Sequence, residues 1–347
     1  MTMSLLFQII LLVFLGLAIS LLGAPVAIWL AKIVDAIDIP DSASHKLHRM
    51  PMPLAGGFVA FWGGGLLFVL FGLWREPTFQ AVFFSGAVIF VFGLLDDIYG
   101  LSAPQKFLGQ ILASILLIHL GISVRFLETV NLPLHLSRLT LLNQVLSVFW
   151  LVGITNAFNL IDSMDGLVAG LTLIISGFFT FITFSSGQTS LALFSSILIG
   201  LSLGLYWHNK HPAHFFLGDS GAQFFGFFLA AVAILYRPPD LDPKSTWFIP
   251  ILLLGVPIFD TTLVTISRLR RKKPIFQADR SHTYHRLVDF GFSPGLSVIA
   301  IQASALVLSF FAFIIMYLSP VWAISLFLLT LLVGLSLIVF FERTFYE

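Results

Sequence analysis

The chain has 347 residues, of which 58% are hydrophobic and only 10% are charged, and its formal net charge is +1. A soluble domain averages about 45–50% apolar and about 25% charged residues, so this composition excludes a protein that faces water on all sides. The small net charge excludes a strongly basic protein that attracts nucleic acid over long distances. Cysteine is absent, which excludes disulfides, thiolate nucleophiles and cysteine-ligated zinc.

Long apolar runs predict an all-α, polytopic integral membrane protein with a single transmembrane domain over residues 1–347. A spanning helix needs about 20 mostly apolar residues. About eleven segments qualify: 5–31, 54–73, 79–95, 106–121, 142–160, 166–184, 190–207, 219–236, 247–267, 297–318 and 321–341. We do not expect the first segment to be a cleavable signal peptide, because no Lys or Arg precedes it and its apolar run is too long. Residues 122–140 mix charged and apolar side chains and are expected to lie at the membrane interface.

The Lys and Arg residues are unevenly divided between the alternating loops. Thirteen of the 18 lie on one side and five on the other, so the richer side should be cytoplasmic, with the N-terminus outside and the C-terminus inside. The cytoplasmic loops would then be 32–53, 96–105, 161–166, 208–218 and 268–295, in a plasma (inner) membrane. The basic run 268–273 directly follows a span, which favours contact with lipid headgroups over contact with nucleic acid.

Two adjacent carboxylates, Asp96 and Asp97, lie at the cytoplasmic end of the third predicted span, and Lys106 opens the next one. Ionisable residues at membrane depth are costly and suggest function. Adjacent helical residues point about 100° apart, so one carboxylate can approach a metal or a diphosphate while the other addresses a second substrate. The Lys106 ammonium would suit a phosphate. We therefore expect these three residues to be catalytic.

A second polar group recurs every third residue: Asn156, Asn159, Asp162 and Asp165. If the segment is helical, this spacing forms one polar stripe across successive turns, which an apolar span would not carry for packing alone. The spacing also resembles a calcium loop, but the downstream Glu that such a loop requires is missing. We exclude calcium and expect a substrate or catalytic role.

The third group follows in residues 208–223, where Asp219 lies in a Gly-Asp-Ser-Gly turn that opens the eighth predicted span. Mg²⁺ usually binds through one or two carboxylates together with substrate phosphates, and a helix N-terminus also favours anions. His208, His211 and His214 are three residues apart and could suggest zinc. Pro212 interrupts the helix that would align their rings, which argues against it.

The last loop carries His282, His285, Arg280 and Arg286 within seven residues. Two His and two Arg side chains make a plausible clamp for a diphosphate, because charge-assisted hydrogen bonds to phosphate are strong. The alternative is an interfacial helix that binds anionic lipid headgroups.

Taken together, these motifs resemble the polyprenyl-phosphate N-acetylhexosamine-1-phosphate transferase family (glycosyltransferase 4), of the bacterial WecA and TagO type and more distantly MraY. The resemblance extends over nearly the whole chain, and the family's topology of eleven spans agrees with the count above. The motifs are PLAGG at 53–57, LDD at 95–97, GLSAPQKFLGQ at 100–110, NAFNLIDSMDGLVAG at 156–170, HPAHFFLGDSGA at 211–222, PIFDT at 257–261 and ADRSHTYHRL at 278–287.

The resemblance implies that a UDP-activated N-acetylhexosamine, with N-acetylglucosamine as the first expectation, gives its sugar-1-phosphate to undecaprenyl phosphate. UMP would be released, and a lipid-linked cell-surface glycan would be started. The resemblance also implies roles for single residues. Asp219 and Asp97 would bind Mg²⁺, with Mn²⁺ as an alternative. Asp96 and Asp97 would contact the metal, the diphosphate or the lipid phosphate. Lys106 would contact a phosphate, and Asp162 and Asp165 would form a second acidic pair. The substrate-binding residues would be Asn156, Asn159, Asn209, Phe216, His48, His282, His285, Arg280 and Arg286, with Asn209 and Phe216 near the uracil.

One departure from the family pattern lies in the last loop. Members of the WecA type carry a His-x-His-His run there, whereas Tyr284 replaces the middle His in this chain, and His282 and His285 keep their register. The sugar specificity is therefore left open, as are the polymer pathway, the oligomeric state (a homodimer is one option) and the identity of any catalytic base.

Two other classes of function stay open. A secondary transporter would place its acids near the middle of the bilayer on broken helices, whereas these acids are predicted at one face. A membrane phosphatase or a CDP-alcohol phosphotransferase would also use metal and carboxylates, but the sequence pattern of the latter is absent. Release of UMP would separate the three.

Overall fold

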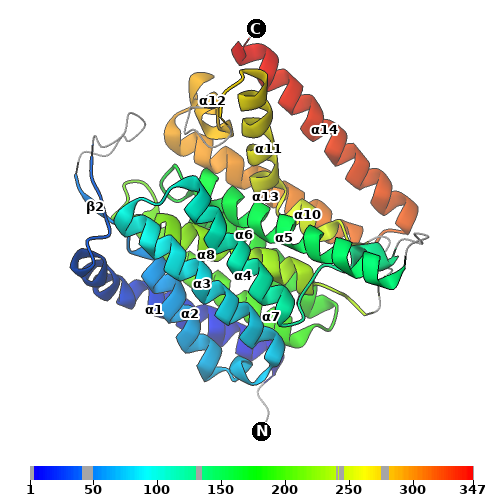
Figure 1. The fold of residues 1–347 in the computed structure, drawn as a ribbon, viewed down its shortest axis with the longest axis horizontal. Coiled ribbons are helices and arrows are strands. Elements are labelled where there is room, and N and C mark those ends of the chain that lie inside the picture. The colour runs from blue at the N-terminus through cyan, green and yellow to red at the C-terminus, as the bar shows by residue number, and fades with distance from the viewer. Residues whose placement is uncertain are drawn as a thin grey trace.

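The computed structural model describes residues 4–40, 50–129, 135–239, 241, 246–274 and 281–346, so the predicted substrate-binding residues His48 and Arg280 lie outside it. The described part is built almost entirely of helices. They are α1 (Leu5–Ile33), α2 (Gly56–Leu70), α3 (Pro77–Tyr99), α4 (Ala103–His119), α5 (Leu136–Ile161), α6 (Leu167–Ser185), α7 (Thr189–Asn209), α8 (Gly218–Leu235), α10 (Ile249–Leu253), α11 (Gly255–Arg270), α12 (Thr283–Asp289), α13 (Pro294–Ile315) and α14 (Pro320–Tyr346), with short 3₁₀ turns at Leu73–Arg75 and Phe126–Thr129 (Figure 1). The strands β1 (Ile37–Asp38) and β2 (Met52–Pro53) pair antiparallel, with Ile37 opposite Pro53.

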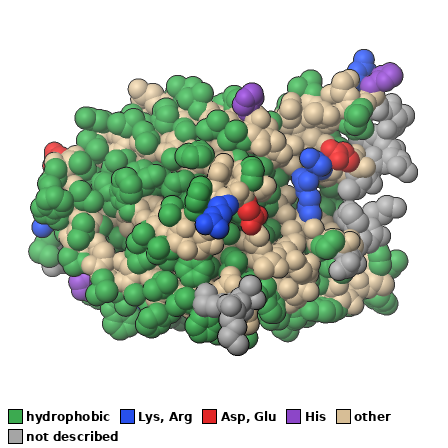
Figure 2. Space-filling view, turned by 90° about the horizontal axis from the view of Figure 1, so that it is seen from below, with side chains coloured by type: hydrophobic (Ala, Val, Ile, Leu, Met, Phe, Trp, Pro, Cys, Tyr) green, Lys and Arg blue, Asp and Glu red, His purple; other side chains and the backbone are tan. Residues whose placement is uncertain are grey.

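The predicted class, an all-α polytopic membrane protein, is confirmed. Eight helices in the described ranges are long and apolar enough to cross a membrane: α1, α3, α5, α6, α7, α8, α13 and α14. Figure 2 shows a face of the molecule on which hydrophobic side chains predominate and charged ones are few. The remaining three predicted spans correspond to shorter or interrupted helices, namely α2 with 15 residues, α4 with 17 residues and the pair α10–α11, which is broken at Leu254. The count of eleven and the orientation stay predictions.

The last residues of the predicted interfacial segment 122–140 are helical, while their position at the membrane interface stays a prediction. Helix α5 already begins at Leu136 and continues without a break to Ile161, over 26 residues. Only one charged residue, Arg138, lies between Leu136 and Leu142, and this short stretch contains no Gly or Pro. Local helix propensity therefore allows α5 to begin at Leu136, before the predicted span 142–160.

Helix α8 is the centre of the bundle. Nearly all of its residues are buried, and it packs against α2, α3 and α5. Glycines permit close approach at these contacts: a Cβ on Gly93 of α3 would lie 2.5 Å from the Cα of Ser220. Small residues at helix contacts are typical of membrane bundles, because they let backbones come together. This packing brings the C-terminal end of α3 directly against the N-terminal end of α8.

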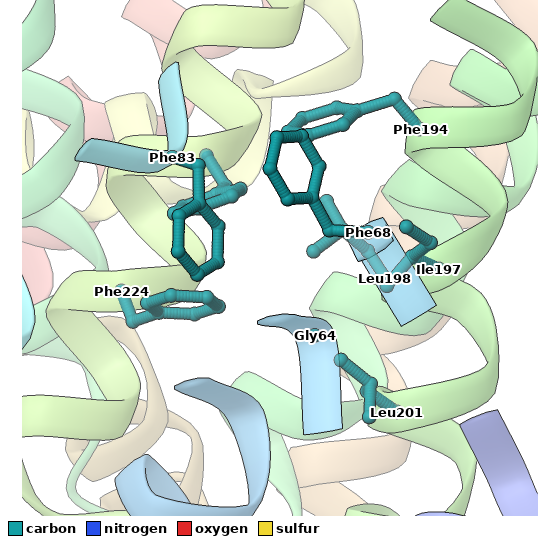
Figure 3. A pocket seen from close by; sticks show the side chains of 9 residues that line it. Gly64, Phe68, Phe83, Phe194, Ile197, Leu198, Leu201 and Phe224 are labelled. Carbon is teal, nitrogen blue, oxygen red and sulfur yellow. The ribbon is translucent and has the colours of Figure 1, made fainter. Parts of the chain in front are cut away.

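An apolar cavity of about 10 Å³ lies between α2, α3, α7 and α8 (Figure 3). This volume is about the minimum that one water molecule needs, and a water also needs polar partners, which the lining does not offer. We therefore interpret the cavity as a packing defect. Its lining residues are Gly64, Phe68, Phe83, Phe194, Ile197, Leu198, Leu201, Phe224 and Phe228.

Candidate active site

Asp97 joins the end of α3 to the start of α8. Its Oδ1 accepts a hydrogen bond from the backbone N–H of Asp219 at 2.7 Å, and its Oδ2 accepts from the N–H of Ser220 at 3.1 Å and from the Ser220 hydroxyl. A carboxylate in this position satisfies unpaired N–H groups and faces the positive end of the helix dipole. Gly218 has φ +73°, and a Cβ there would approach Asp97 Oδ2 to 2.7 Å, so this contact requires glycine.

Lys106 at the start of α4 bridges two carboxylates. Its Nζ pairs with Asp96 Oδ2 and lies 2.7 Å from Asp219 Oδ2. Asp96 Oδ1 accepts from the backbone N–H of Leu101 at 2.8 Å, and the side chains of Asp96 and Asp219 lie within reach of each other. The Asp96 side chain is 4% exposed, whereas those of Lys106 and Asp219 are 30% and 32% exposed. The Lys106 ammonium and the Asp219 carboxylate are therefore accessible to a ligand.

The end of α5 completes this cluster. The Asn159 amide lies near the Asp219 carboxylate, and the half-buried Asn156 lies three residues earlier on the same helix. Asp162, just past the helix end, is partly buried. Burial raises the pKa of Asp162 to about 8, and the negative charges of Asp219 and Asp165 add to this effect. Asp162 therefore shares the electrostatic environment of Asp219.

The helical stripe predicted for residues 156–165 is wrong beyond Asn159. Helix α5 ends at Ile161, and the chain turns through Gly166, which has φ +76°. Asp and Ser side chains compete for backbone hydrogen bonds and favour such turns. Asp165 consequently points to the α7–α8 loop, where its Oδ2 lies 2.9 Å from His211 Nδ1 and accepts from the N–H of Ala213 at 3.3 Å. Asp162 and Asp165 do not share a helix face.

Asn209 and Phe216, the residues predicted near the uracil, both hold loops together. The Asn209 amide is buried: its Oδ1 accepts from the N–H of Gly166 at 3.0 Å, and its Nδ2 donates to the carbonyl of Phe215 at 3.1 Å. The backbone N–H of Phe216 donates to the carbonyl of Pro53 at 3.0 Å. Their contact with a base stays a prediction.

The His-bearing helix α12 is anchored to α11 through Asp260. Asp260 Oδ2 lies 2.8 Å from His282 Nδ1, and its Oδ1 accepts from the N–H of Thr283 at 2.7 Å. The Tyr284 hydroxyl contacts His285 Nε2, so the residue that departs from the family pattern pairs directly with a predicted substrate contact. Asp260 was not among the predicted site residues. The signal that could have identified it is an acidic residue inside an otherwise apolar span.

Arg286 has different partners from those that a phosphate clamp needs. Its side chain is 1% exposed and reaches the side chain of Glu342 in α14, with Nη2 2.8 Å from Oε1. Its Nε donates to the carbonyl of Ser281 at 2.9 Å, and Nη2 also donates to Ser267 Oγ at 3.0 Å. The geometry therefore does not support the predicted contact between Arg286 and a donor phosphate. It supports an anchoring role for α12.

A magnesium ion would fit the carboxylates of this cluster only if water and substrate supplied its remaining ligands. Within the described ranges, no three His, Asp or Glu side chains form a group that could hold a metal ion. Mg²⁺ commonly uses one or two carboxylates and completes its shell with water and substrate phosphates. Asp219 can form such a pair with Asp96 or with Asp97. Both of these carboxylates already have a partner on each oxygen, and a carboxylate oxygen can accept more than one contact. The donor set is thus suited to a magnesium ion bound together with a phosphate.

A surface hollow of about 380 Å³ lies elsewhere, between the start of α3 and the α6–α7 turn. It is lined in part by Glu76 and Ser190, whose side chains share a hydrogen bond of 2.7 Å. Because α3 rises about 1.5 Å per residue, this hollow is about 30 Å from Asp96. The hollow therefore lies at the opposite end of α3 from the carboxylate cluster.

Comparisons with known proteins point to one family. The model of Glycosyl transferase family 4 matches residues 79–237. A probable undecaprenyl-phosphate N-acetylglucosaminyl 1-phosphate transferase of Bacillus subtilis is 36% identical over 318 residues, which cover 90% of this chain and 86% of the relative. A decaprenyl-phosphate N-acetylglucosaminephosphotransferase of Mycobacterium tuberculosis is 31% identical (76% and 72% covered). A phospho-N-acetylmuramoyl-pentapeptide-transferase of Listeria welshimeri is also 31% identical (78% and 86% covered).

Proposed function

Since the chain belongs to glycosyl transferase family 4, we propose that it transfers N-acetylglucosamine-1-phosphate from UDP-N-acetylglucosamine to undecaprenyl phosphate. The name of the Bacillus relative, which matches 90% of the chain, supports the acceptor and the sugar. The observation that carries the proposal is the exposed pair of Lys106 and Asp219 beside Asp96, at helix ends where a lipid phosphate and a water-soluble donor can meet.

In the proposed reaction, an oxygen of the lipid phosphate attacks the phosphorus atom that carries the sugar. A new P–O bond forms to the lipid phosphate, and the bond to the oxygen of the UMP phosphate breaks, so that UMP leaves with the electron pair. Phosphoryl transfer depends mainly on positioning and on neutralising charge. The second pKa of a phosphate monoester is about 6, so the nucleophile is already largely a dianion and needs no strong base.

The side chains divide this work according to their surroundings. Lys106, which is partly exposed, would donate to a phosphate oxygen, and Asp97 would hold the start of α8 so that Asp219 is fixed in place. Asp219 and Asp96 would hold Mg²⁺, which when bound supplies Lewis-acid stabilisation of phosphate charge. His282 and His285 would contact the donor, each oriented by a neighbour, Asp260 or Tyr284.

The decisive assay is incubation of the purified protein with undecaprenyl phosphate and a panel of UDP-sugars in Mg²⁺, Mn²⁺ or EDTA. We expect UMP and a lipid-linked sugar in equal amounts with UDP-N-acetylglucosamine, and none in EDTA. Asp219→Ala should remove nearly all turnover, because a lost metal ligand costs several kcal/mol of stabilisation. Glu76→Gln, at the opposite end of α3, is the matched control. Inorganic phosphate without UMP would indicate a phosphatase instead, and full activity of Asp219→Ala would refute the site.

We further propose that the carboxylate cluster lies at the cytoplasmic face of the inner membrane. The excess of Lys and Arg in the loops on that side supports this orientation. Single cysteines can test it, because the chain has none of its own. Lys273→Cys should be protected from a membrane-impermeant thiol reagent in intact cells, whereas Thr189→Cys, exposed at the other end of the bundle, should react. The reverse labelling would overturn the orientation while leaving the reaction untouched.

A further inference from the structure

Two polar contacts join α4 to α8, one helical turn apart. Lys106 and Gln110 are four residues apart on α4, and Asp219 and Gln223 are four residues apart on α8. The outer contact is the Lys106–Asp219 ion pair of 2.7 Å. The inner contact is a hydrogen bond of 3.0 Å from Gln110 Nε2 to Gln223 Oε1. Residues at i and i+4 lie on one helix face, so the amide pair lies directly behind the ion pair.

These contacts matter because α4 and α8 share little other direct contact. Helix α4 packs mainly against α3 and α5, and α8 packs mainly against the same two helices and α2. Long side chains therefore bridge the gap between α4 and α8. If the inner bridge were lost, the distance between Lys106 and Asp219 would depend on the shared packing against α3 and α5 and on their own flexible side chains.

Packing alone does not explain the amide pair. Gln110 and Gln223 are 1% and 2% exposed, and Gln110 Oε1 has no hydrogen-bond partner within the described ranges. An unsatisfied polar atom in an apolar interior is costly, and methionine would fill a similar volume without that cost. A sequence selected for stability alone would favour two apolar residues here.

We propose that Gln110 and Gln223 are positioning residues, which hold α4 and α8 at the separation and register that present the Lys106 ammonium and the Asp219 carboxylate together to phosphate. The inference rests on the proposed function, since it assigns those two groups to phosphate. Neither glutamine touches the substrates. Their contribution is to the geometry of the outer pair.

The test compares Gln110→Met, Gln223→Met and the double substitution. Each single variant leaves one amide buried without its partner, so its unfolding temperature and its kcat should both fall. The double variant removes both amides, so its unfolding temperature should recover to that of the wild type or above. Its kcat should stay about 10- to 100-fold low, because misplacement of about 1 Å costs that much in rate. The KM of each substrate should change little. Ser114→Ala, one turn further along α4, is the control, because that hydroxyl donates to the backbone carbonyl of Gln110 within the same helix.

A second measurement does not depend on activity. Spin labels on Lys106→Cys and Asp219→Cys report the separation of the two helix ends, and the distance distribution should be broader or displaced in the double methionine background. An unchanged distribution overturns the proposal, and so does a double variant whose kcat recovers together with its stability. If the wild type released no UMP with any UDP-sugar, the proposed reaction would fail, while the spin-label distances would still decide whether the glutamines position the two groups.

Discussion

The buried ion pair between Arg286 and Glu342 should determine whether α12 stays attached to the bundle. Glu342 comes from the last turns of α14, a helix that lies along one side of the molecule and ends beside α11 and α12 (Figure 1). Its Oε1 lies 2.8 Å from Arg286 Nη2, and its Oε2 lies 3.4 Å from Arg270 Nη1. A single carboxylate thus connects α14 to both α11 and α12. The perturbation is Glu342→Gln, which keeps the shape of the side chain and removes its charge.

The expected cost is large because both partners are buried, with side chains only 1% and 3% exposed. Removing one partner of a buried ion pair costs about 3–5 kcal/mol, whereas replacing both by apolar residues is often neutral or stabilising. At roughly 2 °C per kcal/mol for a chain of this size, Glu342→Gln should lower the unfolding temperature by about 6–10 °C. The double variant Arg286→Met with Glu342→Leu should recover most of that loss.

Thermal unfolding in detergent measures the global effect, and hydrogen exchange over residues 281–290 measures release of α12. Arg343→Gln, the exposed neighbour of Glu342, is the control and should change stability by less than about 0.5 kcal/mol. If Glu342→Gln left both the unfolding temperature and the exchange of α12 at wild-type values, the pair would carry no net stability. A double variant whose loss of stability equals the sum of the losses in Arg286→Met alone and Glu342→Leu alone would refute the coupling between the two residues.

Four further outcomes can be measured by thermal unfolding. Gly64→Ala should stabilise the protein by about 0.5–1 kcal/mol, because a Cβ there meets its neighbours only at 3.5 Å or more. Gly86→Ala should destabilise it, because the added Cβ would overlap the ring of Phe228, and equal effects at the two glycines would contradict the packing. Asn209→Ala should cost roughly 2 kcal/mol, since two buried backbone groups lose their partner; an unchanged midpoint would mean that water replaces the amide. Mg²⁺ at about 100 times its Kd should stabilise the wild type by about 2.7 kcal/mol, and Asp219→Ala should lose this gain; an equal gain in both would place the ion elsewhere.

The membrane class and most helix positions could be predicted from the sequence, because hydropathy directly reports which segments avoid water. The third predicted span, 79–95, lies within α3, and Asp96 and Asp97 do lie at its end. The polar clusters could also be predicted from the sequence, because ionisable residues at membrane depth are costly and suggest function. The grouping of Asp96, Lys106 and Asp219 in space follows from their common place at helix ends.

The partners of individual side chains could not be predicted in the same way. The three-residue spacing that starts at Asn156 predicts a longer helix than the one observed. The chain leaves the helix before Gly166, which adopts a left-handed conformation in the folded loop. Arg286 pairs with Glu342, 56 residues away, and no local pattern encodes that contact. The hydrogen bonds from the first backbone N–H groups of α8 to Asp97 were likewise not predicted, because the sequence presented this carboxylate only as a contact for metal or phosphate. In each case tertiary packing determines which partner the side chain contacts, and the local sequence does not distinguish among the possible partners.

Asp162 lies just past the end of α5, close to the proposed magnesium site. Burial raises the pKa of this carboxyl to about 8, and the negative charges of Asp219 and Asp165 add to the effect. A divalent cation at Asp219 would oppose that contribution, because a nearby positive charge favours the ionised form of a carboxyl. Binding of magnesium should therefore lower the pKa of Asp162, so that the proposed site couples the protonation of this carboxyl to the occupancy of the metal.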